Sequence, residues 1–355
     1  MSLTKPSISL NTFRNQAYEL AVRTHETEQQ LAKGAKHTFI DLFAGIGGVR
    51  LAFEREGAHC VFSSDYDLHA QLTYYKNHGV VPFGDITKIC ASTIPQHDIL
   101  CAGFPCQPFS HIGRREGFEH PTQGTMFYEI IRIIRHRMPK AIFLENVLGI
   151  INHDGGNTLK IIINSLEELG YSCQYTTLNS ADFGIAQNRK RFYLVAFKDN
   201  IAFDFPKPPM IYADVGDLIE SNVTGYTISK HLQQSYLFKH DDGRPELIDS
   251  NTKGPIKTLV SSYHKIQRLT GTFVKGGKTG VRLLTANECK KLMGFPEDFI
   301  FPVSRTQMYR QMGNSVTIPV VQSIAKEIIK ALELKKEVGE KIRLSSEHVQ
   351  LEMNL

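Results

Sequence analysis

Short apolar runs alternate with helix-like stretches from residue 37 to residue 198. Strands of a parallel sheet read as continuous apolar runs, and amphipathic crossover helices connect them. We therefore expect a doubly wound, mostly parallel α/β sheet. The segments of strand character lie at 37–43, 59–64, 80–87, 98–102, 141–146, 171–179 and 191–197, and those of helix character at 49–56, 68–77, 126–138 and 157–169.

This alternation stops near Phe203, where the proline-rich run FDFPKPPM marks a boundary. At the other end, residues 1–36 are polar and predict one helix from about Asn11 to Lys33. The expected parts are an N-terminal helical extension at 1–36, a catalytic and cofactor-binding domain at 37–203, a smaller, mostly β and loop domain at 204–300, and a C-terminal segment at 301–355 that returns to the first domain.

Composition narrows the class of protein. Of the 355 residues 41% are hydrophobic, and no apolar run approaches the length of a membrane span. The six cysteines form no CxxC pair and no metal-ligand spacing with histidine, so we expect reduced thiols in a cytoplasmic protein without a metal site. Net charge is only +5, but residues 253–291 hold nine Lys or Arg against one Glu. That excess suits a polyanion-binding surface, and a solvated basic face explains it equally well.

Cys106 follows a predicted strand, at the strand end where α/β enzymes carry their catalytic residues. The strand at 98–102 runs into GFPCQPFS, in which Pro105 fixes the backbone before Cys106 and Pro108 delays a following helix. A thiolate in a positive environment is a nucleophile, whereas a cysteine in a soluble protein is more often structural. Cys106 is thus a candidate nucleophile whose assignment depends on its neighbours.

A glycine turn, AGIGG, follows the first strand and allows a cofactor to approach the backbone. Its GxGG spacing departs from the GxGxxG of dinucleotide-binding folds, and no GKS or GKT indicates a phosphate loop. Asp41, Asp65 and Asp85 come at the ends of the first three predicted strands. Three carboxylates suit S-adenosylmethionine, which has a ribose and a cationic end and no phosphate. As the alternative, Asp41 and Asp85 cap helices or turns.

Two further strand ends carry candidate chemistry. Glu145 and Asn146 end the strand at 141–146, and a protonated carboxyl there can donate to a ring nitrogen and make the ring easier for a thiol to attack. Arg189 and Arg191, in QNRKRF, fall on one face of the last strand and suit carbonyl or phosphate oxygens. A solvated glutamate and a surface salt-bridge pair are the ordinary alternatives.

The ordered set FIDLFAGIGG, GDIT, GFPCQPFS, ENV, QNRKRF, RLLTANECKKLMGFP and QMGNSV resembles the motif set of the cytosine-5 DNA methyltransferases. The chain is most similar to the compact bacterial type II modification methylases of restriction–modification systems. The resemblance covers residues 37–198 and about 255–325. It implies a fold of the S-adenosylmethionine-dependent methyltransferase type, in which the domain at 204–300 recognises the target.

The resemblance also implies a reaction. Cys106 would add to carbon 6 of a cytosine flipped out of double-stranded DNA, while Glu145 would bond the ring nitrogen and amino group. Arg189 and Arg191 would hold the cytosine carbonyl and the thiolate geometry. A methyl group would pass from S-adenosylmethionine to carbon 5, and Cys106 would then be expelled. Residues 107–123 would form a loop that closes over the base.

For the cofactor, the resemblance implies that Phe43 contacts adenine, Asp65 the ribose and Asp85 the adenine amino group. The full set of expected cofactor-binding residues is Asp41, Phe43, Gly45, Gly47, Asp65, Tyr66, Asp85, Ile86, Pro105, Asn314 and Ser315. Two positions depart from an arginine that is common in the family. Gln123 bears on the anchoring of the loop, and Asn287 on domain packing.

Residues 198–281 leave room for one target-recognition region, whose basic stretch SSYHKIQRLTGTFVKGGKTG holds candidates for base and phosphate contact. In this stretch His264, Gln267 and Arg268 are the expected base readers, and Arg244 is a candidate wedge beside the flipped base. The full expected DNA-binding set is Ser110, Arg244, His264, Gln267, Arg268, Lys275 and Lys278.

Other classes of function stay open from the sequence alone. Cytosine methylation in RNA uses similar chemistry, and a non-catalytic DNA-binding regulator can keep a retired enzyme scaffold. Intact Cys106, Glu145 and Arg189 argue against a retired site, and the GxGG turn disfavours a dinucleotide oxidoreductase. We expect a monomer in the bacterial cytoplasm that acts on double-stranded DNA, with a cognate restriction endonuclease for the same site.

Overall fold

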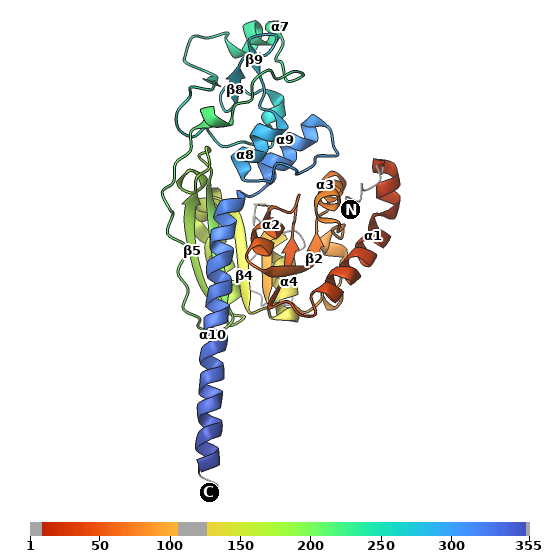
Figure 1. Cartoon of the computed structure of the whole chain (residues 1–355), viewed down its shortest axis with the longest axis vertical. Coiled ribbons are helices and arrows are strands. Elements are labelled where there is room, and N and C mark those ends of the chain that lie inside the picture. Colours follow the sequence, from red (N-terminus) through yellow and green to blue (C-terminus); the bar gives the residue numbers. More distant parts are fainter. Residues whose placement is uncertain (1–8, 106–125, 353–355) are drawn as a thin grey trace.

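The computed structural model describes residues 9–105 and 126–352, with side chains up to residue 335. It has a broad α/β body and a smaller lobe at one end (Figure 1). The described strands are β1 His37–Leu42, β2 Ala58–Ser64, β3 Ile99–Gly103, β4 Ala141–Val147, β5 Ser172–Asn179, β6 Lys190–Phe197, β7 Glu246–Ile248, β8 Thr272–Lys275 and β9 Val281–Arg282. The described α-helices are α1 Leu10–Leu31, α2 Gly48–Arg55, α3 Leu68–His78, α4 Met126–Arg137, α5 Gly149–Asn152, α6 Asn157–Glu167, α7 Lys230–Leu232, α8 Ala286–Met293, α9 Arg305–Asn314 and α10 Ile318–Glu352.

The body is built on a six-stranded sheet in the order β2-β1-β3-β4-β6-β5. Strands β1 to β4 pair in parallel, whereas β6 runs antiparallel to both β4 and β5. The predicted mostly parallel sheet is therefore confirmed. The chain leaves β1 for β2 on one side and returns to β3 on the other. Such a reversal opens a crevice at the carboxyl ends of the strands.

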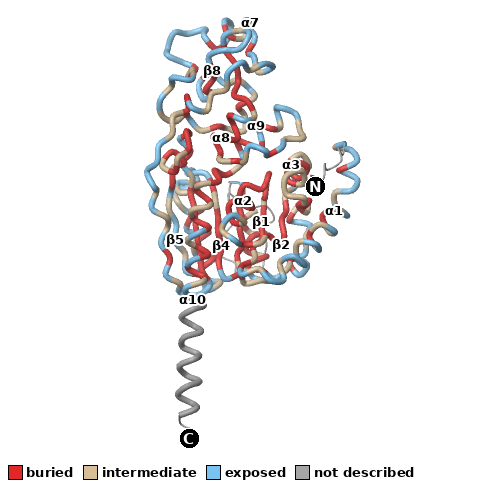
Figure 2. The backbone as a smooth tube through the Cα atoms, viewed as in Figure 1, coloured by how far each residue is buried: buried red, intermediate tan, exposed pale blue. Residues whose placement is uncertain are grey.

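Helices cover both faces of this sheet, and the alternation of side chains along each strand creates two cores. Phe39, Cys101 and Phe143 share one core with apolar residues of α2 and α10. Their neighbours Ile40 and Leu100 face the opposite core, which α4 and α6 complete. Figure 2 shows the buried residues concentrated in the sheet between these layers.

The segment at 80–87 is not the strand that we expected. It pairs with the sheet only through an isolated bridge between Ser64 and Phe83, after which Asp85 caps a short 3₁₀ turn, Ile86–Lys88. Pro82 lies inside the expected strand and has no N–H for a ladder, which accounts for the single bridge. The segment nevertheless follows the outer edge of β2.

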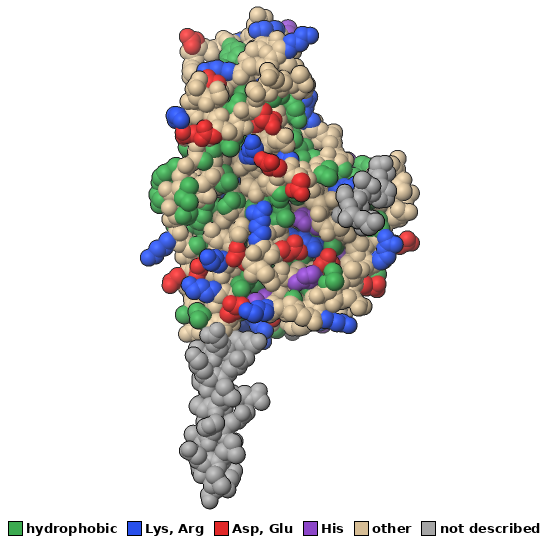
Figure 3. Space-filling model, viewed as in Figure 1, with side chains coloured by type: hydrophobic (Ala, Val, Ile, Leu, Met, Phe, Trp, Pro, Cys, Tyr) green, Lys and Arg blue, Asp and Glu red, His purple; other side chains and the backbone are tan. Residues whose placement is uncertain are grey.

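The smaller lobe holds a three-stranded sheet, β7-β8-β9, joined by long irregular segments. It falls within the range 204–300 and has the mostly β and loop character that the sequence predicts. Helices α8 and α9 lie between this lobe and the body (Figure 1). On the face drawn in Figure 3, basic and acidic side chains are interspersed over the lobe. No helix in the described part of the chain is long and apolar enough to cross a membrane.

Candidate active site

A cavity of about 580 Å³ opens at the carboxyl ends of β1, β3 and β4, where the strand order reverses. The glycine turn after β1, the exits of β2, β3 and β4, the start of β6 and the end of α9 all contribute to its wall. Among the lining residues are Phe43, Gly45, Asp65, Tyr66, Asp85, Pro105, Glu145, Arg189, Arg191, Asn314 and Ser315. Segments distant in the sequence thus converge on one site.

The glycine turn and Asp65 form one end of the cavity. The amide of Gly45 donates to Oδ2 of Asp65 at 2.8 Å, and the amide of Asp67 donates to Oδ1 at 2.8 Å. Burial raises the pKa of Asp65 to about 6, and the two amides oppose that rise. Phe43 lines the same cavity and has a left-handed φ of 58°. An aromatic ring and a half-buried carboxylate in one cavity fit the base and the hydroxyls of a nucleoside.

Asp85 lines the same end of the cavity and also caps a turn, while its contact with a cofactor stays a prediction. Its Oδ1 accepts from the amide of Thr87 at 3.0 Å, and it thereby caps the 3₁₀ turn that follows. The residue also faces the cavity. A cap thus anchors a carboxylate that still reaches the site.

Glu145 and Arg191 form the other end. Because β6 is antiparallel, its beginning meets the end of β4, and Nε of Arg191 lies 3.3 Å from Oε1 of Glu145. Burial raises the pKa of Glu145, while the guanidinium of Arg191 opposes the change. Gly103 pairs with Glu145 across the strands, and a Cβ there would lie 3.5 Å from Oε2. A buried carboxyl that keeps its proton can serve as a hydrogen-bond donor.

Asn146 holds the exit of the neighbouring strand. Its buried amide nitrogen donates to the carbonyl of Phe104 at 2.9 Å, and its Oδ1 accepts from the amide of Val147 at 2.8 Å. This fixes the backbone one residue before Pro105, which is exposed at the cavity. The next twenty residues, among them Cys106, Ser110 and Gln123, lie outside the described residues.

Arg189 does not have the free guanidinium that we expected for a cytosine carbonyl. Its Nη1 donates to the carbonyl of Leu259 at 3.1 Å, and its Nη2 donates to those of Gly313 and Ser315 at 3.0 and 2.6 Å. The side chain is buried and lines the cavity. It therefore fastens the second lobe and the end of α9 to the catalytic sheet, and Arg191 is the arginine beside Glu145.

Three of the expected cofactor residues do not line the cavity. Asp41 comes one position before the end of β1, so its side chain enters the sheet interior, where burial raises its pKa to about 8. Neither carboxyl oxygen of Asp41 has a hydrogen-bond partner in the described structure. Gly47 has a φ of 87°, and a Cβ there would meet the His78 ring at 2.2 Å, so this glycine serves packing. Ile86 belongs to the apolar core.

The end of α9 closes the cavity. Asn314 and Ser315 line it as expected, and Arg310 lines it as well, which the sequence reasoning missed. Arg310 precedes Asn314 by four positions, and this helical spacing could have revealed it. Gly313 packs so closely that a Cβ would lie 2.1 Å from the amide nitrogen of Ser261.

In the second lobe, Arg268 is not available to read bases. Its buried guanidinium donates to the carbonyls of Leu237 and His240 and pairs with Asp242. It therefore holds two neighbouring loops together.

The other expected DNA contacts of this lobe lie at its surface and stay predictions. They are Arg244, Gln267 and Lys278, which are exposed, His264, which is half-buried, and Lys275, whose Nζ lies 2.9 Å from Oδ2 of Asp249. Asn287, a departure from the family pattern, donates to Glu220 at 3.0 Å and thus takes part in packing around α8.

Among the described residues, no group of three His, Cys, Asp or Glu side chains could hold a metal ion. The cysteines that the structure describes are free thiols, namely Cys60, Cys90, Cys101, Cys173 and Cys289.

Comparisons with known proteins agree with this geometry. The family described as C-5 cytosine-specific DNA methylase matches residues 37–330. Type II methyltransferase M.MspI of Moraxella is 67% identical, over 91% of this chain and 77% of that protein. Type II methyltransferase M.BsuFI of Bacillus subtilis is 51% identical, over 85% and 75%. A Spodoptera frugiperda DNMT2 mutant structure has the same fold, with a TM-score of 0.69 at 22% identity, over 83% of this chain and 100% of that one.

Proposed function

Since the chain belongs to the C-5 cytosine-specific DNA methylase family, we propose that its cavity holds S-adenosylmethionine beside Asp65 and a flipped cytosine beside Glu145. The chain is a DNA cytosine-5 methyltransferase, and its type II relatives make it a modification enzyme of the restriction–modification kind. The observation that carries the proposal is the single cavity, in which a nucleoside-binding end and a buried carboxyl with its arginine meet.

The residues at the first end fit the cofactor. Asp65 can accept from ribose hydroxyls, Phe43 can contact the adenine ring, and the carboxylate of Asp85 suits the adenine amino group. Asn314 and Ser315 would hold the methionine end. When bound, S-adenosylmethionine supplies the methyl group that carbon 5 of the cytosine receives.

The residues at the second end act on the base. Glu145, whose raised pKa favours the protonated form, donates to the ring nitrogen and draws electron density from carbon 6. We assign the cytosine carbonyl to Arg191, because the guanidinium of Arg189 is already bound to three main-chain carbonyls. The Cys106 thiolate adds to carbon 6 and leaves again once the carbon 5 proton has departed.

The second lobe would supply target recognition. We propose 37–203 as the catalytic domain, 204–300 as the target-recognition domain and 301–355 as the segment that returns to the catalytic domain. The proposed DNA contacts of the target-recognition domain are Arg244, His264, Gln267, Lys275 and Lys278. We also propose that the enzyme acts as a monomer on double-stranded DNA in the cytoplasm, beside a cognate endonuclease.

The test is methyl transfer from labelled S-adenosylmethionine to a DNA of mixed sequence, followed by bisulfite sequencing. We expect methylation of carbon 5 within one short motif, its loss in Cys106→Ser, and a covalent adduct on DNA that contains 5-fluorocytosine. Transfer to RNA but not to DNA would contradict the DNA assignment. Absence of cofactor binding would indicate a non-catalytic DNA-binding protein instead.

A further inference from the structure

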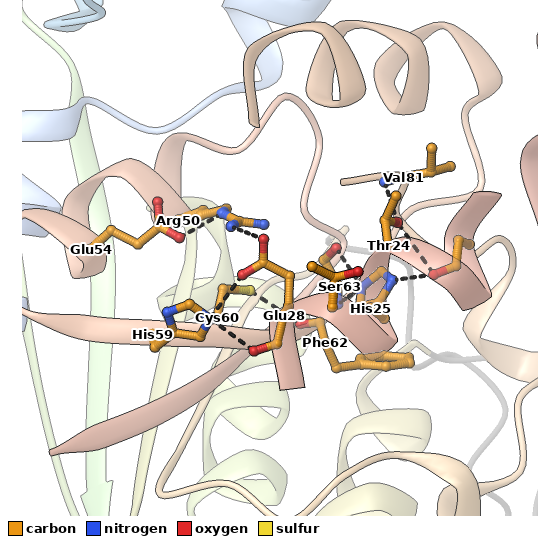
Figure 4. Close-up of polar contacts among 12 residues, drawn as sticks. Thr24, His25, Glu28, Arg50, Glu54, His59, Cys60, Phe62, Ser63 and Val81 are labelled. Carbon is orange, nitrogen blue, oxygen red and sulfur yellow. Dashed lines mark hydrogen bonds and ion pairs between the residues drawn. The ribbon is translucent and has the colours of Figure 1, made fainter. Parts of the chain in front are cut away.

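Helix α1 lies outside the matched family region, 37–330, yet it packs along the outer edge of the catalytic sheet. Its apolar residues Phe13 and Ala21 form a small core with Leu72 of α3 and with Val81. Figure 4 shows the polar side of this contact, where α1 meets β2, α2 and the segment around Val81. The helix thus touches three segments that adjoin the cofactor end of the cavity.

Two side chains of α1 accept hydrogen bonds from the main chain of the body. Nε2 of His25 accepts from the amide of Ser63 at 2.9 Å, while Oγ1 of Thr24 accepts from the amide of Val81 at 3.2 Å (Figure 4). Strand β2 is an edge strand of the sheet, and the outward amide of Ser63 bonds His25 in place of a further strand. Thr24 holds the neighbouring segment at Val81 in the same way.

His25 is held in the tautomer that this contact needs. Its Nδ1 lies 2.9 Å from the carbonyl of Ala21 and donates to it, which leaves Nε2 as the acceptor. Burial lowers the pKa of His25 to about 4, so the ring is neutral near pH 7. The ring also lies 4.7 Å from that of Phe83, centroid to centroid.

The two segments that α1 holds lead directly to the cavity carboxylates. Ser63 is two residues before Asp65, and Phe83 is two residues before Asp85. They are also joined to each other, since the carbonyl of Ser63 accepts from the amide of Phe83 and the amide of Asp65 donates to the carbonyl of Phe83, both at 2.8 Å. A shift of either segment would therefore displace both carboxylates.

An ionic contact adds to the attachment of α1 one turn further along the helix, at Glu28. Oε1 of Glu28 lies 3.2 Å from Nη2 of Arg50, and Oε2 lies 2.8 Å from Nε2 of His59. Arg50 belongs to α2, which begins at the glycine turn that lines the cavity. Helix α1 thereby contacts β2, the segment around Val81 and α2, which all adjoin the nucleoside end of the cavity.

We propose that α1 is a positioning element of the cofactor site, with His25 and Thr24 as positioning residues that set Asp65 and Asp85 for the nucleoside end of S-adenosylmethionine. This inference rests on the proposed function of the cavity. It gives a role in the known reaction to a helix that the family region leaves out.

The test uses point variants of the full chain. His25→Leu removes the acceptor for Ser63, and His25→Gln restores one at the position of Nε2. Thr24→Val removes the acceptor for Val81 without changing the side-chain shape. Thr27→Val is the matched control, because Thr27 is on the same helix, is exposed, and bonds only the carbonyl of Arg23 among the contacts described.

Equilibrium dialysis with labelled S-adenosylmethionine shows whether α1 positions the cofactor site or only stabilises the fold. We expect about tenfold weaker binding in His25→Leu, because the unpaired amide of Ser63 lets β2 shift and displace Asp65, and tenfold lies within the cost of one unpaired buried amide. In Thr24→Val we expect about threefold weaker binding. His25→Gln and Thr27→Val should bind like the natural chain. At saturating cofactor, kcat and the KM for DNA should be unchanged in all four.

Lower thermal stability with unchanged cofactor binding would overturn the inference, as would a lower kcat at saturating cofactor. If His25→Leu does not fold, Thr24→Val against Thr27→Val decides the matter. Failure of the proposed function has a different signature, because the natural chain would then not transfer methyl groups at all.

Discussion

Replacing Arg189 by methionine should weaken the fold and the cofactor site together. The guanidinium of Arg189 bonds carbonyls of Leu259, Gly313 and Ser315 at 2.6–3.1 Å, and it lines the cavity from a buried position. Methionine keeps most of the length of the side chain and removes every donor. The three carbonyls then lose their charged partner, two of them beside the residues expected to hold the methionine end.

The magnitude follows from these contacts. A hydrogen bond to a charged group contributes about 1.5–3 kcal/mol, and three such bonds sharing one cation do not add fully. We therefore expect the free energy of unfolding to fall by about 3–5 kcal/mol, which is less than three independent bonds of this kind would contribute. In a chain of this size the melting temperature should drop by about 4–7 °C.

The assay compares Arg189→Met with Arg191→Met by thermal melting, by cofactor dialysis and by methyl transfer at saturating cofactor. Arg191 contacts Glu145 and the carbonyl of Lys190, so its replacement should leave melting and cofactor binding nearly unchanged and lower kcat about a hundredfold. If Arg189→Met melts like the natural chain, binds the cofactor normally and loses only kcat, then Arg189 acts on the base and our assignment is wrong.

Three other perturbations test the site and its surroundings. Burial raises the pKa of Asp41 to about 8, above its unfolded value, so the stability of the natural chain should fall as pH rises from about 4 to 8. Asp41→Asn should remove that fall and add about 2–4 kcal/mol at pH 8, which urea unfolding at both pH values measures. If Glu145 acts in its protonated form, as we propose, kcat/KM should decline as pH rises through its raised pKa, and Glu145→Gln should lose this decline while lowering kcat. A methyl group at Gly313 would overlap the backbone at Ser261, so Gly313→Ala should lower the melting temperature and weaken cofactor binding in dialysis.

Much of the sheet and part of the site could be predicted from the sequence. Apolar runs bounded by glycine, proline or polar residues are local signals, so the order of strands and helices was readable except at 80–87, where Pro82 interrupts pairing. Asp65 and Glu145 were recognisable because residues at the carboxyl ends of parallel strands reach the crevice. The position of Asp65 and of Glu145 relative to the strand end was therefore enough to predict that they line the cavity.

The same reasoning fails where a shift of one position along a strand turns a side chain from the cavity into the core. Asp41 is a single position short of the end of β1, and alternation turns it into the core instead of the cavity. Arg189 and Arg268 look like free cations in the sequence, yet both are bound to carbonyls 28 or more residues away. Such partners depend on the tertiary fold, which no local pattern contains. The role of α1 was hidden for the same reason, since its contacts at Ser63 and Val81 are distant in the chain.

The antiparallel direction of β6 explains how one motif can serve both lobes. If β6 ran parallel to β4, its first residues would lie at the amino edge of the sheet, far from the cavity. Running the other way, it brings QNRKRF to the carboxyl edge, where Arg191 meets Glu145. Gln187, just before the strand, accepts from the amide of Leu259 and donates to the carbonyl of Leu292, both at 2.7 Å. The motif therefore joins the second lobe to the sheet beside Glu145, so that one short chain segment sets both the position of the lobe and the surroundings of the carboxyl that we propose acts on the base.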